Sequence, residues 1–200
     1  SYQIPVHLEN DANCVGLSEL LAHPEIENAA CVVIGTGIGG AMIINGKLHR
    51  GRHGLGGEFG YMTTIEPAEK LSNWSQLAST GNMVRYVIEK SDQSDWDGRK
   101  VYQEASAGNA LCQEAIERMN RNLAQGLLNI QYLIDPDVIS LGGSISQNPD
   151  FIKGVQKAVD VFVERYEEYT IAPVIQACTY HADANLYGAL VNWLQEENQW

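Results

Sequence analysis

Asp11 is the residue of this 200-residue sequence whose type and position most directly indicate chemistry. It lies in Asn10-Asp11-Ala12-Asn13, where a predicted strand over residues 4–8 gives way to a predicted helix over residues 14–21. A helix N-terminus stabilises negative charge, so the Asp11 carboxylate could take a proton from a bound hydroxyl. The motif equally fits a helix cap, because Asn and Asp side chains accept hydrogen bonds from the free N–H groups there.

A second acidic residue, Glu58, lies in a loop that contains five glycines between residues 51 and 60. So many glycines exclude a regular element and let the backbone approach a ligand closely. The alternative is that Glu58 only forms solvated ion pairs with Arg50, Arg52 or His53. The sequence leaves both interpretations open.

The glycine cluster Gly35-Thr36-Gly37-Ile38-Gly39-Gly40 has the spacing of a dinucleotide-binding loop but lacks its context. In that loop the glycines open a helix, whereas here strand-prone residues 41–44 and an Asn45-Gly46 turn follow. A glycine bend between antiparallel strands can still bind phosphate, because its backbone N–H groups can converge on an anion and Thr36 adds a hydroxyl. A hairpin without a ligand is the alternative.

The remaining elements must position these residues, and their order predicts an α/β fold with a mixed sheet. Strands are predicted over residues 31–34, 41–44, 138–141 and 172–178. Helices are predicted over residues 109–134, 150–163 and 183–194, with two or three short ones between 72 and 107. Leu141-Gly142-Gly143-Ser144 lies where a strand turns into a helix, and its small residues either admit a flat ring or simply permit packing.

The composition of the chain argues against several classes of partner. Twenty-five acidic residues against thirteen Lys and Arg give a net charge of −12, which disfavours nucleic acid and anionic membranes. No apolar run is long enough for a membrane span, and no signal-peptide pattern starts the chain. Four cysteines, Cys14, Cys31, Cys112 and Cys178, have no metal-ligand spacing and are expected to be reduced core residues. We expect a cytoplasmic protein with a small-molecule substrate and no metal site.

Taken together, Leu8–Cys14, Ile34–Gly40, Gly56–Gly60 and Leu141–Ser144 resemble, in order and spacing, the ROK family of sugar kinases and sugar-responsive repressors. The likeness spans nearly the whole chain and is greatest to streptococcal members described as sugar kinases. It implies the actin-like ATPase (ribonuclease H-like) fold, with a mixed sheet flanked by helices and two lobes that close over a sugar and ATP. It also implies transfer of the γ-phosphoryl group to a hexose hydroxyl, usually at carbon 6.

The resemblance implies a role for each matched residue. Asp11 would be the general base, while Asn10 and Glu58 would hydrogen-bond the sugar hydroxyls. ATP, with its Mg²⁺, would lie along a phosphate cradle and beside two further glycines. The residues expected in these two nucleotide contacts are Gly35, Thr36, Gly37, Gly39 and Gly40 for the phosphates, and Gly142 and Gly143 for adenosine.

Two departures from the family pattern concern the sugar. Tyr61 stands where many members have a His that touches sugar and zinc, and residues 62–82 contain no Cys for a zinc loop. We therefore expect no zinc. We also expect Tyr61 to line the sugar site and reshape it around carbons 1 and 2. Glucose, mannose, fructose, N-acetylmannosamine and β-glucosides all remain candidates.

The family's first phosphate motif, an Asp followed by Gly-Gly-Thr, is expected upstream of Asn10 and is missing from this chain. We therefore expect a fragment that is inactive alone. Residues 1–24 would hold the last strand and interlobe helix of a truncated N-terminal lobe, and residues 25–200 the C-terminal lobe. The family suggests a homodimer. The alternative function is the sugar-sensing effector domain of a ROK repressor, although the retained glycine cluster and Asp11 argue against it.

Overall fold

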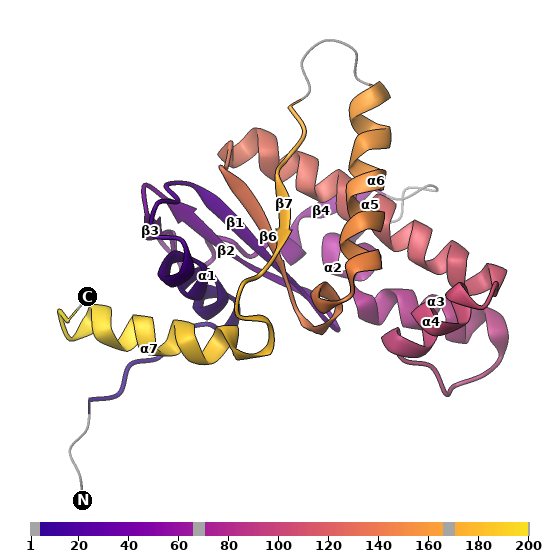
Figure 1. The fold of residues 1–200 in the computed structure, drawn as a ribbon, viewed down its shortest axis with the longest axis horizontal. Coiled ribbons are helices and arrows are strands. Elements are labelled where there is room, and N and C mark those ends of the chain that lie inside the picture. The colour runs from indigo at the N-terminus through magenta and orange to yellow at the C-terminus, as the bar shows by residue number, and fades with distance from the viewer. Residues whose placement is uncertain (1–4, 66–70, 166–170, 200) are drawn as a thin grey trace, which may run out of the picture.

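The computed structural model describes residues 5–65, 71–165 and 171–199, which form a five-stranded sheet with helices on both faces (Figure 1). The strands lie in the order β3-β2-β1-β6-β7. Their bounds in that order are Lys47–Leu48, Ile38–Ile44, Ala29–Ile34, Val138–Gly142 and Ile175–Ala177. β1 pairs antiparallel with β2 and β2 with β3, whereas β1 with β6 and β6 with β7 are parallel. The predicted mixed α/β sheet is confirmed.

Strand β1 shows why the sheet must be covered on both sides. Its residues Ala30, Val32 and Ile34 belong to the core cluster that includes helix α5, Ala110–Ile134. Ala29 and Cys31 belong to clusters on the other face, with α1, Asp11–Ala22, and α7, Ala184–Glu196. Successive strand side chains point to opposite faces, so burial on both faces requires the unbroken apolar run that β1 has.

Helices α5 and α6 lie on the face of the sheet opposite α1 and α7, and three short helices pack against α5 (Figure 1). The short helices fill the stretch where two or three were predicted. A two-stranded sheet and three 3-10 turns complete the described elements. The bounds are α2 Trp74–Ala78, α3 Thr80–Ser91, α4 Gly98–Ser106, α6 Pro149–Arg165, β4 Thr63–Ile65, β5 Leu71–Asn73, η1 Phe59–Tyr61, η3 Ser144–Gln147 and η4 His181–Asp183.

The strand predicted over residues 4–8 is wrong for its described part, because Pro5–Asn10 forms no regular element. Val6 and Leu8 are exposed, no described strand lies beside them, and Pro5 has no N–H to donate to a ladder. Alternating apolar residues form a strand only where a partner strand is available. Ile4 lies outside the described residues. The last predicted strand is also shorter, since only Ile175–Ala177 pairs with β6.

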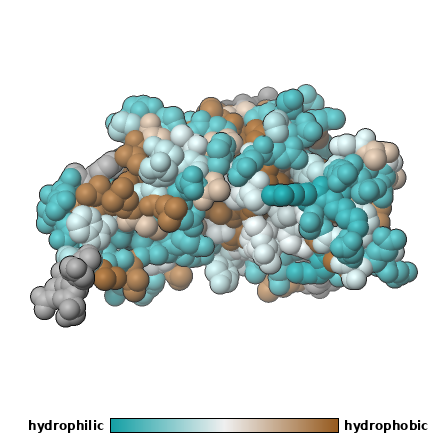
Figure 2. Space-filling model, turned by 60° about the horizontal axis from the view of Figure 1, so that its bottom comes forward, coloured by the Kyte–Doolittle hydropathy of each residue, from teal (hydrophilic) through white to brown (hydrophobic). Residues whose placement is uncertain are grey.

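The cysteines lie in the core, whereas α7 carries apolar side chains at the surface. All four cysteines are buried and form no disulfide, as predicted. Apolar side chains reach the surface of α7, where Leu186 and Leu190 are more than half exposed, and Figure 2 shows an apolar band in this region. No helix among the described residues is long and apolar enough to cross a lipid bilayer.

Candidate active site

The glycine cluster forms the tight connection between β1 and β2, as predicted. Ile34 pairs with Ile38 across the bend, and the Gly35 N–H donates to the Gly37 carbonyl over 2.9 Å. Strand β2 follows the glycines directly, so the dinucleotide-binding arrangement is excluded. The N–H of Gly81, in the first turn of α3, donates to the Gly35 carbonyl over 3.1 Å. This contact holds the exposed bend, Gly35–Gly37, against the start of α3.

Asp11 is the first residue of α1, and Asn10 caps that helix. The Asn10 side-chain oxygen accepts hydrogen bonds from the N–H groups of Ala12 and Asn13 at 2.9 and 3.1 Å. The Asp11 carboxylate accepts one from the Ala12 N–H at 2.8 Å. The cap interpretation of Asn10 is therefore correct, and only its amide NH₂ is left to bind a ligand. The helix N-terminus stabilises the charge on Asp11.

A cavity of about 550 Å³ brings most of the predicted sugar and phosphate residues together. The predicted residues that line it are Asp11, Gly35, Thr36, Gly37, Gly39, Glu58 and Tyr61. Residues from α2, α3 and the start of α7 line it too, among them Ser75, Gln76, Arg85 and Asn185. This second group was not predicted, because polar residues on ordinary helices carry no distinguishing pattern in one sequence.

Glu58, directly before the short turn η1, and Tyr61, the last residue of that turn, both line this first cavity. Glu58 is half-buried, and its carbonyl accepts a hydrogen bond from the Tyr61 N–H over 3.1 Å. Tyr61 is 74% exposed, so its ring lies at the rim rather than in the wall. Glu58 makes no ion pair with any residue that the structure describes. The alternative, in which Glu58 only pairs with Arg50, Arg52 or His53, is therefore wrong, and Arg50 has another partner.

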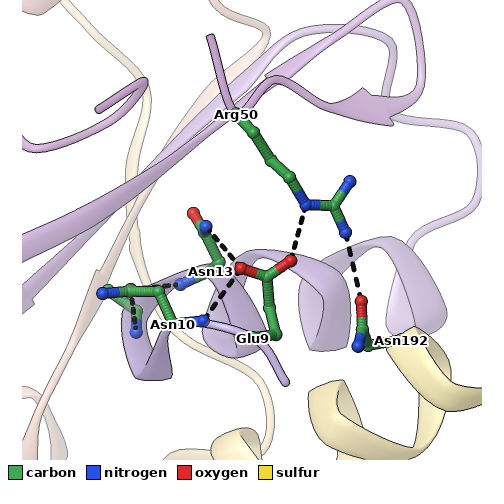
Figure 3. Close-up of polar contacts among 6 residues, drawn as sticks. Glu9, Asn10, Asn13, Arg50 and Asn192 are labelled. Atoms are coloured by element: carbon green, nitrogen blue, oxygen red, sulfur yellow. Dashed lines mark hydrogen bonds and ion pairs between the residues drawn. The ribbon is translucent and has the colours of Figure 1, made fainter. Parts of the chain in front are cut away.

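That partner is Glu9, at the centre of a polar network that holds the segment before Asp11 (Figure 3). The Arg50 guanidinium donates to Glu9 over 2.6 Å and to Asn192 of α7 over 3.1 Å. The Asn13 amide and the Asn10 backbone N–H also donate to Glu9, each over 2.8 Å. Burial raises the pKa of Glu9, but these hydrogen bonds and the Arg50 charge outweigh it and hold the pKa below its usual value.

A second cavity of about 500 Å³ also reaches the start of α3. Ser79 lines the first cavity and the next residue, Thr80, lines the second. The other residues lining the second cavity come from α4 and from the segment after β6: Asp97, Gly98, Arg99, Tyr102, Ser144, Ile145, Gln147 and Asn148. The bend Gly35–Gly37 lines the first cavity and contacts Gly81, the residue after Thr80.

Two buried hydroxyls of this second cavity lack partners. Neither the Thr80 hydroxyl nor the Tyr102 hydroxyl has a hydrogen-bond partner among the described residues. Burial, with a smaller effect of the Asp150 charge, raises the pKa of Tyr102 and keeps its hydroxyl protonated. Buried polar groups without partners are rare in folded proteins, so an ordered water or a polar ligand would have to satisfy these two hydroxyls.

Three predicted nucleotide residues line neither cavity. Gly40 packs under Phe59 and Gly57, and Gly142 is buried against Cys178. Gly143 has a positive φ of 89°, and a Cβ there would lie 2.1 Å from the Ile34 carbonyl oxygen. Its missing side chain is thus required by packing between β1 and β6. Among the described residues, no three His, Cys, Asp or Glu side chains are grouped as metal ligands.

The sequence profile that describes the ROK family matches residues 1–196. The chain belongs to the ROK family. It is 33% identical to a Listeria monocytogenes β-glucoside kinase over 98% of this chain and 67% of the relative. A Streptococcus pneumoniae ROK family protein, solved with sucrose, is 89% identical with a TM-score of 0.95, covering 99% of this chain and 68% of that one. A Streptomyces griseus ROK glucokinase, solved with glucose and AMPPNP, is 26% identical with a TM-score of 0.80, covering 96% and 69%.

The ROK chain described here therefore has the actin-like ATPase fold of that family, as predicted, with a mixed sheet flanked by helices. It spans about two thirds of the length of these relatives. Named sugar kinases recur among the relatives, which supports sugar phosphorylation as the general activity of its close kin.

Proposed function

We propose that this chain is part of an ATP-dependent sugar kinase that transfers the γ-phosphoryl group to the carbon-6 hydroxyl of a hexose. Two cavities that both reach the start of α3 carry the proposal, and the glycine bend lines the first of them. One holds the carboxylates Asp11 and Glu58, and the other holds the unpartnered hydroxyls of Thr80 and Tyr102. An adenosine in the second cavity and a sugar in the first would be joined by a phosphate chain along the bend.

In the proposed reaction Asp11 accepts the proton of the hexose hydroxyl while the hydroxyl oxygen attacks the γ-phosphorus. The bond from that phosphorus to the β–γ bridging oxygen breaks, and ADP leaves. N–H groups of the bend and the Thr36 hydroxyl donate to the phosphate oxygens. Mg²⁺ that arrives with ATP neutralises part of the phosphate charge. Glu58 accepts hydrogen bonds from ring hydroxyls, and the Asn10 amide donates one.

The sugar that we propose is the glucose unit of a glycoside. Tyr61 supports this choice, because a ring at the exposed rim can stack on a substituent at carbon 1 without closing the cavity. The β-glucoside kinase named among the relatives and the sucrose bound to the 89% identical protein support it as well. The Tyr61 ring at the rim would have no such substituent to stack on with free glucose, mannose, fructose or N-acetylmannosamine.

We also propose the lobe boundary that the sequence indicates, with residues 1–24 belonging to an interlobe region and residues 25–200 to the C-terminal lobe. The exposed apolar residues Val6, Leu8, Leu186 and Leu190 support it, because a preceding lobe would cover them (Figure 2). The proposed kinase is the whole protein, and the chain alone would lack the rest of the phosphate site.

ADP release by the whole protein tests the proposal. With Mg·ATP, we expect release only when a hexose or glycoside is present, and faster release with β-glucosides than with free glucose. The alternative is the effector domain of a ROK repressor, which binds sugar without phosphorylating it. Sugars that raise the melting temperature but never stimulate ADP release would reject the kinase and favour that sensor.

A further inference from the structure

Arg85 is the one cation among the described residues that line the first cavity, beside the carboxylates Asp11 and Glu58. It lies on α3, one helical turn beyond Gly81. Gly81 touches the glycine bend directly, because its N–H donates to the Gly35 carbonyl over 3.1 Å. A Cβ on Gly81 would lie 2.5 Å from the Thr36 carbonyl oxygen. Arg85 therefore starts from the helix face that lies against the bend.

The direction of helical side chains carries Arg85 further toward the bend. In an α-helix the side chain leans toward the helix N-terminus and onto the residue four positions earlier. For Arg85 that residue is Gly81, which has no side chain of its own to block the approach. This general direction would bring the guanidinium toward the segment Gly35–Gly37, which lines the same cavity as Arg85.

The guanidinium of Arg85 has no hydrogen bond or ion pair with any residue that the structure describes. Arg50 differs, because it is held by Glu9 and Asn192. Arg85 is also exposed, so its five N–H donors are available to a ligand. Neither carboxylate of the cavity neutralises it within ion-pair distance.

We infer that Arg85 binds the terminal phosphates of ATP at the glycine bend, an inference that rests on the proposed kinase function. A triphosphate placed beside Asp11 and Glu58, in a chain of net charge −12, needs a local cation. Arginine binds phosphate oxygens in a bidentate fork and stays charged at every physiological pH. The guanidinium also stabilises the charge that moves onto the β–γ bridging oxygen during transfer.

Calorimetric titration of the whole protein with AMPPNP and with AMP, in Mg²⁺ and without sugar, tests this role. Arg85→Gln is expected to weaken AMPPNP binding by about 10- to 100-fold, because hydrogen bonds to charged groups are lost. AMP binding should stay unchanged, since AMP carries no terminal phosphates. The AMPPNP affinity of Arg85→Lys should lie between those of the wild type and Arg85→Gln. The control Arg121→Gln removes an exposed charge from α5 outside both cavities and should match the wild type.

The outcomes separate this inference from the proposed function. A wild-type protein that binds no AMPPNP overturns both. A wild type that binds AMPPNP, with Arg85→Gln binding it equally well, overturns the role of Arg85 and leaves the kinase intact. A variant that loses AMP and AMPPNP binding equally also overturns that role, because the defect is then structural. If a separate titration shows weaker glycoside binding while AMPPNP binding is unchanged, the role at the phosphates is overturned and Arg85 is assigned to the sugar.

Discussion

The Asp11 carboxylate is expected to contribute to turnover rather than to sugar binding. Asp11→Asn keeps the size of the side chain and an oxygen for the Ala12 N–H, but it cannot accept a proton. Steady-state kinetics of the whole protein should show kcat lower by about 10²- to 10⁴-fold and a nearly unchanged KM for sugar. A variant with wild-type kcat would remove Asp11 from the mechanism.

Removal of the Tyr102 hydroxyl is expected to preserve or raise the stability of the ligand-free protein but to lower its affinity for AMP. Tyr102→Phe removes a buried donor that has no partner among the described residues, so the ligand-free protein should be as stable as the wild type or more so. If adenosine uses that hydroxyl, AMP affinity should fall by about 2- to 10-fold. Urea denaturation and AMP titration measure the two effects. Reduced stability with unchanged AMP affinity would contradict the assignment of the second cavity.

Among single site residues, those with distinctive neighbours in the sequence could be predicted. Asp11 at a helix start, Glu58 among glycines and the bend Gly35–Gly37 all come to one cavity. Arg85 and Tyr102 were missed, because each is one polar residue on an amphipathic helix and only tertiary packing brings it to a cavity. Gly40, Gly142 and Gly143 were assigned to nucleotide contacts, yet packing against neighbouring backbone explains their missing side chains.

Among the elements, the segment before α1 is held by the Glu9 network. We therefore expect the contribution of Glu9 to the free energy of unfolding to depend on pH. The pKa of Glu9 is lower in the folded state than its ordinary value of 4.5, so its contribution to stability is complete above pH 4.5 and is lost as pH falls through the lowered value. Wild type should exceed Glu9→Gln in free energy of unfolding by about 1 kcal/mol at pH 7. At pH 3 the difference should be smaller, because protonation of Glu9 weakens these contacts.

Urea denaturation at the two pH values measures this difference. Glu27→Gln is the matched control, because the exposed Glu27 side chain has no partner among the described residues. Its difference from wild type should be the same at both pH values. A Glu9→Gln difference that persists unchanged at pH 3 would show that the side chain acts through packing instead.

The packing of α1 on α7 depends on Gly188. A Cβ at this position would lie 1.7 Å from the Cys14 carbonyl oxygen, which cannot rotate away because it is backbone. Gly188→Ala should therefore lower the free energy of unfolding by about 1–3 kcal/mol, despite the better helix propensity of Ala. Ala189→Ser changes an exposed neighbour and should stay within about 0.5 kcal/mol of wild type. Equal stability of Gly188→Ala and wild type would refute this packing.

Elements with strong local signals were predictable, and those that depend on distant partners were not. The apolar period of α5, and the Asn45-Gly46 turn with φ angles of 52° and 68°, are encoded in adjacent residues. The strand predicted over residues 4–8 failed because strand formation needs a neighbour. The β4–β5 pairing, which joins Thr63 to Asn73, was not anticipated for the same reason.

For the whole molecule, the first cavity forms at one short bend between β1 and β2, and both cavities reach the start of α3. The antiparallel bend, the start of α3 and the N-terminus of α1 come from distant parts of the sequence, and the mixed sheet brings them together. The class of fold could be predicted because strands and helices alternate. The identity of the sugar could not, because it depends on the shape of the rim around Tyr61.

The most direct test of the proposed reaction is the product itself. The whole protein would be incubated with Mg·ATP and a β-glucoside, and the mixture examined by phosphorus–proton correlated NMR. We predict a new phosphomonoester signal coupled to the two carbon-6 protons of the glucose unit, formed together with ADP. A glycoside that binds the protein yet stays unphosphorylated would contradict the kinase, and a phosphate on another carbon would contradict the proposed position of transfer.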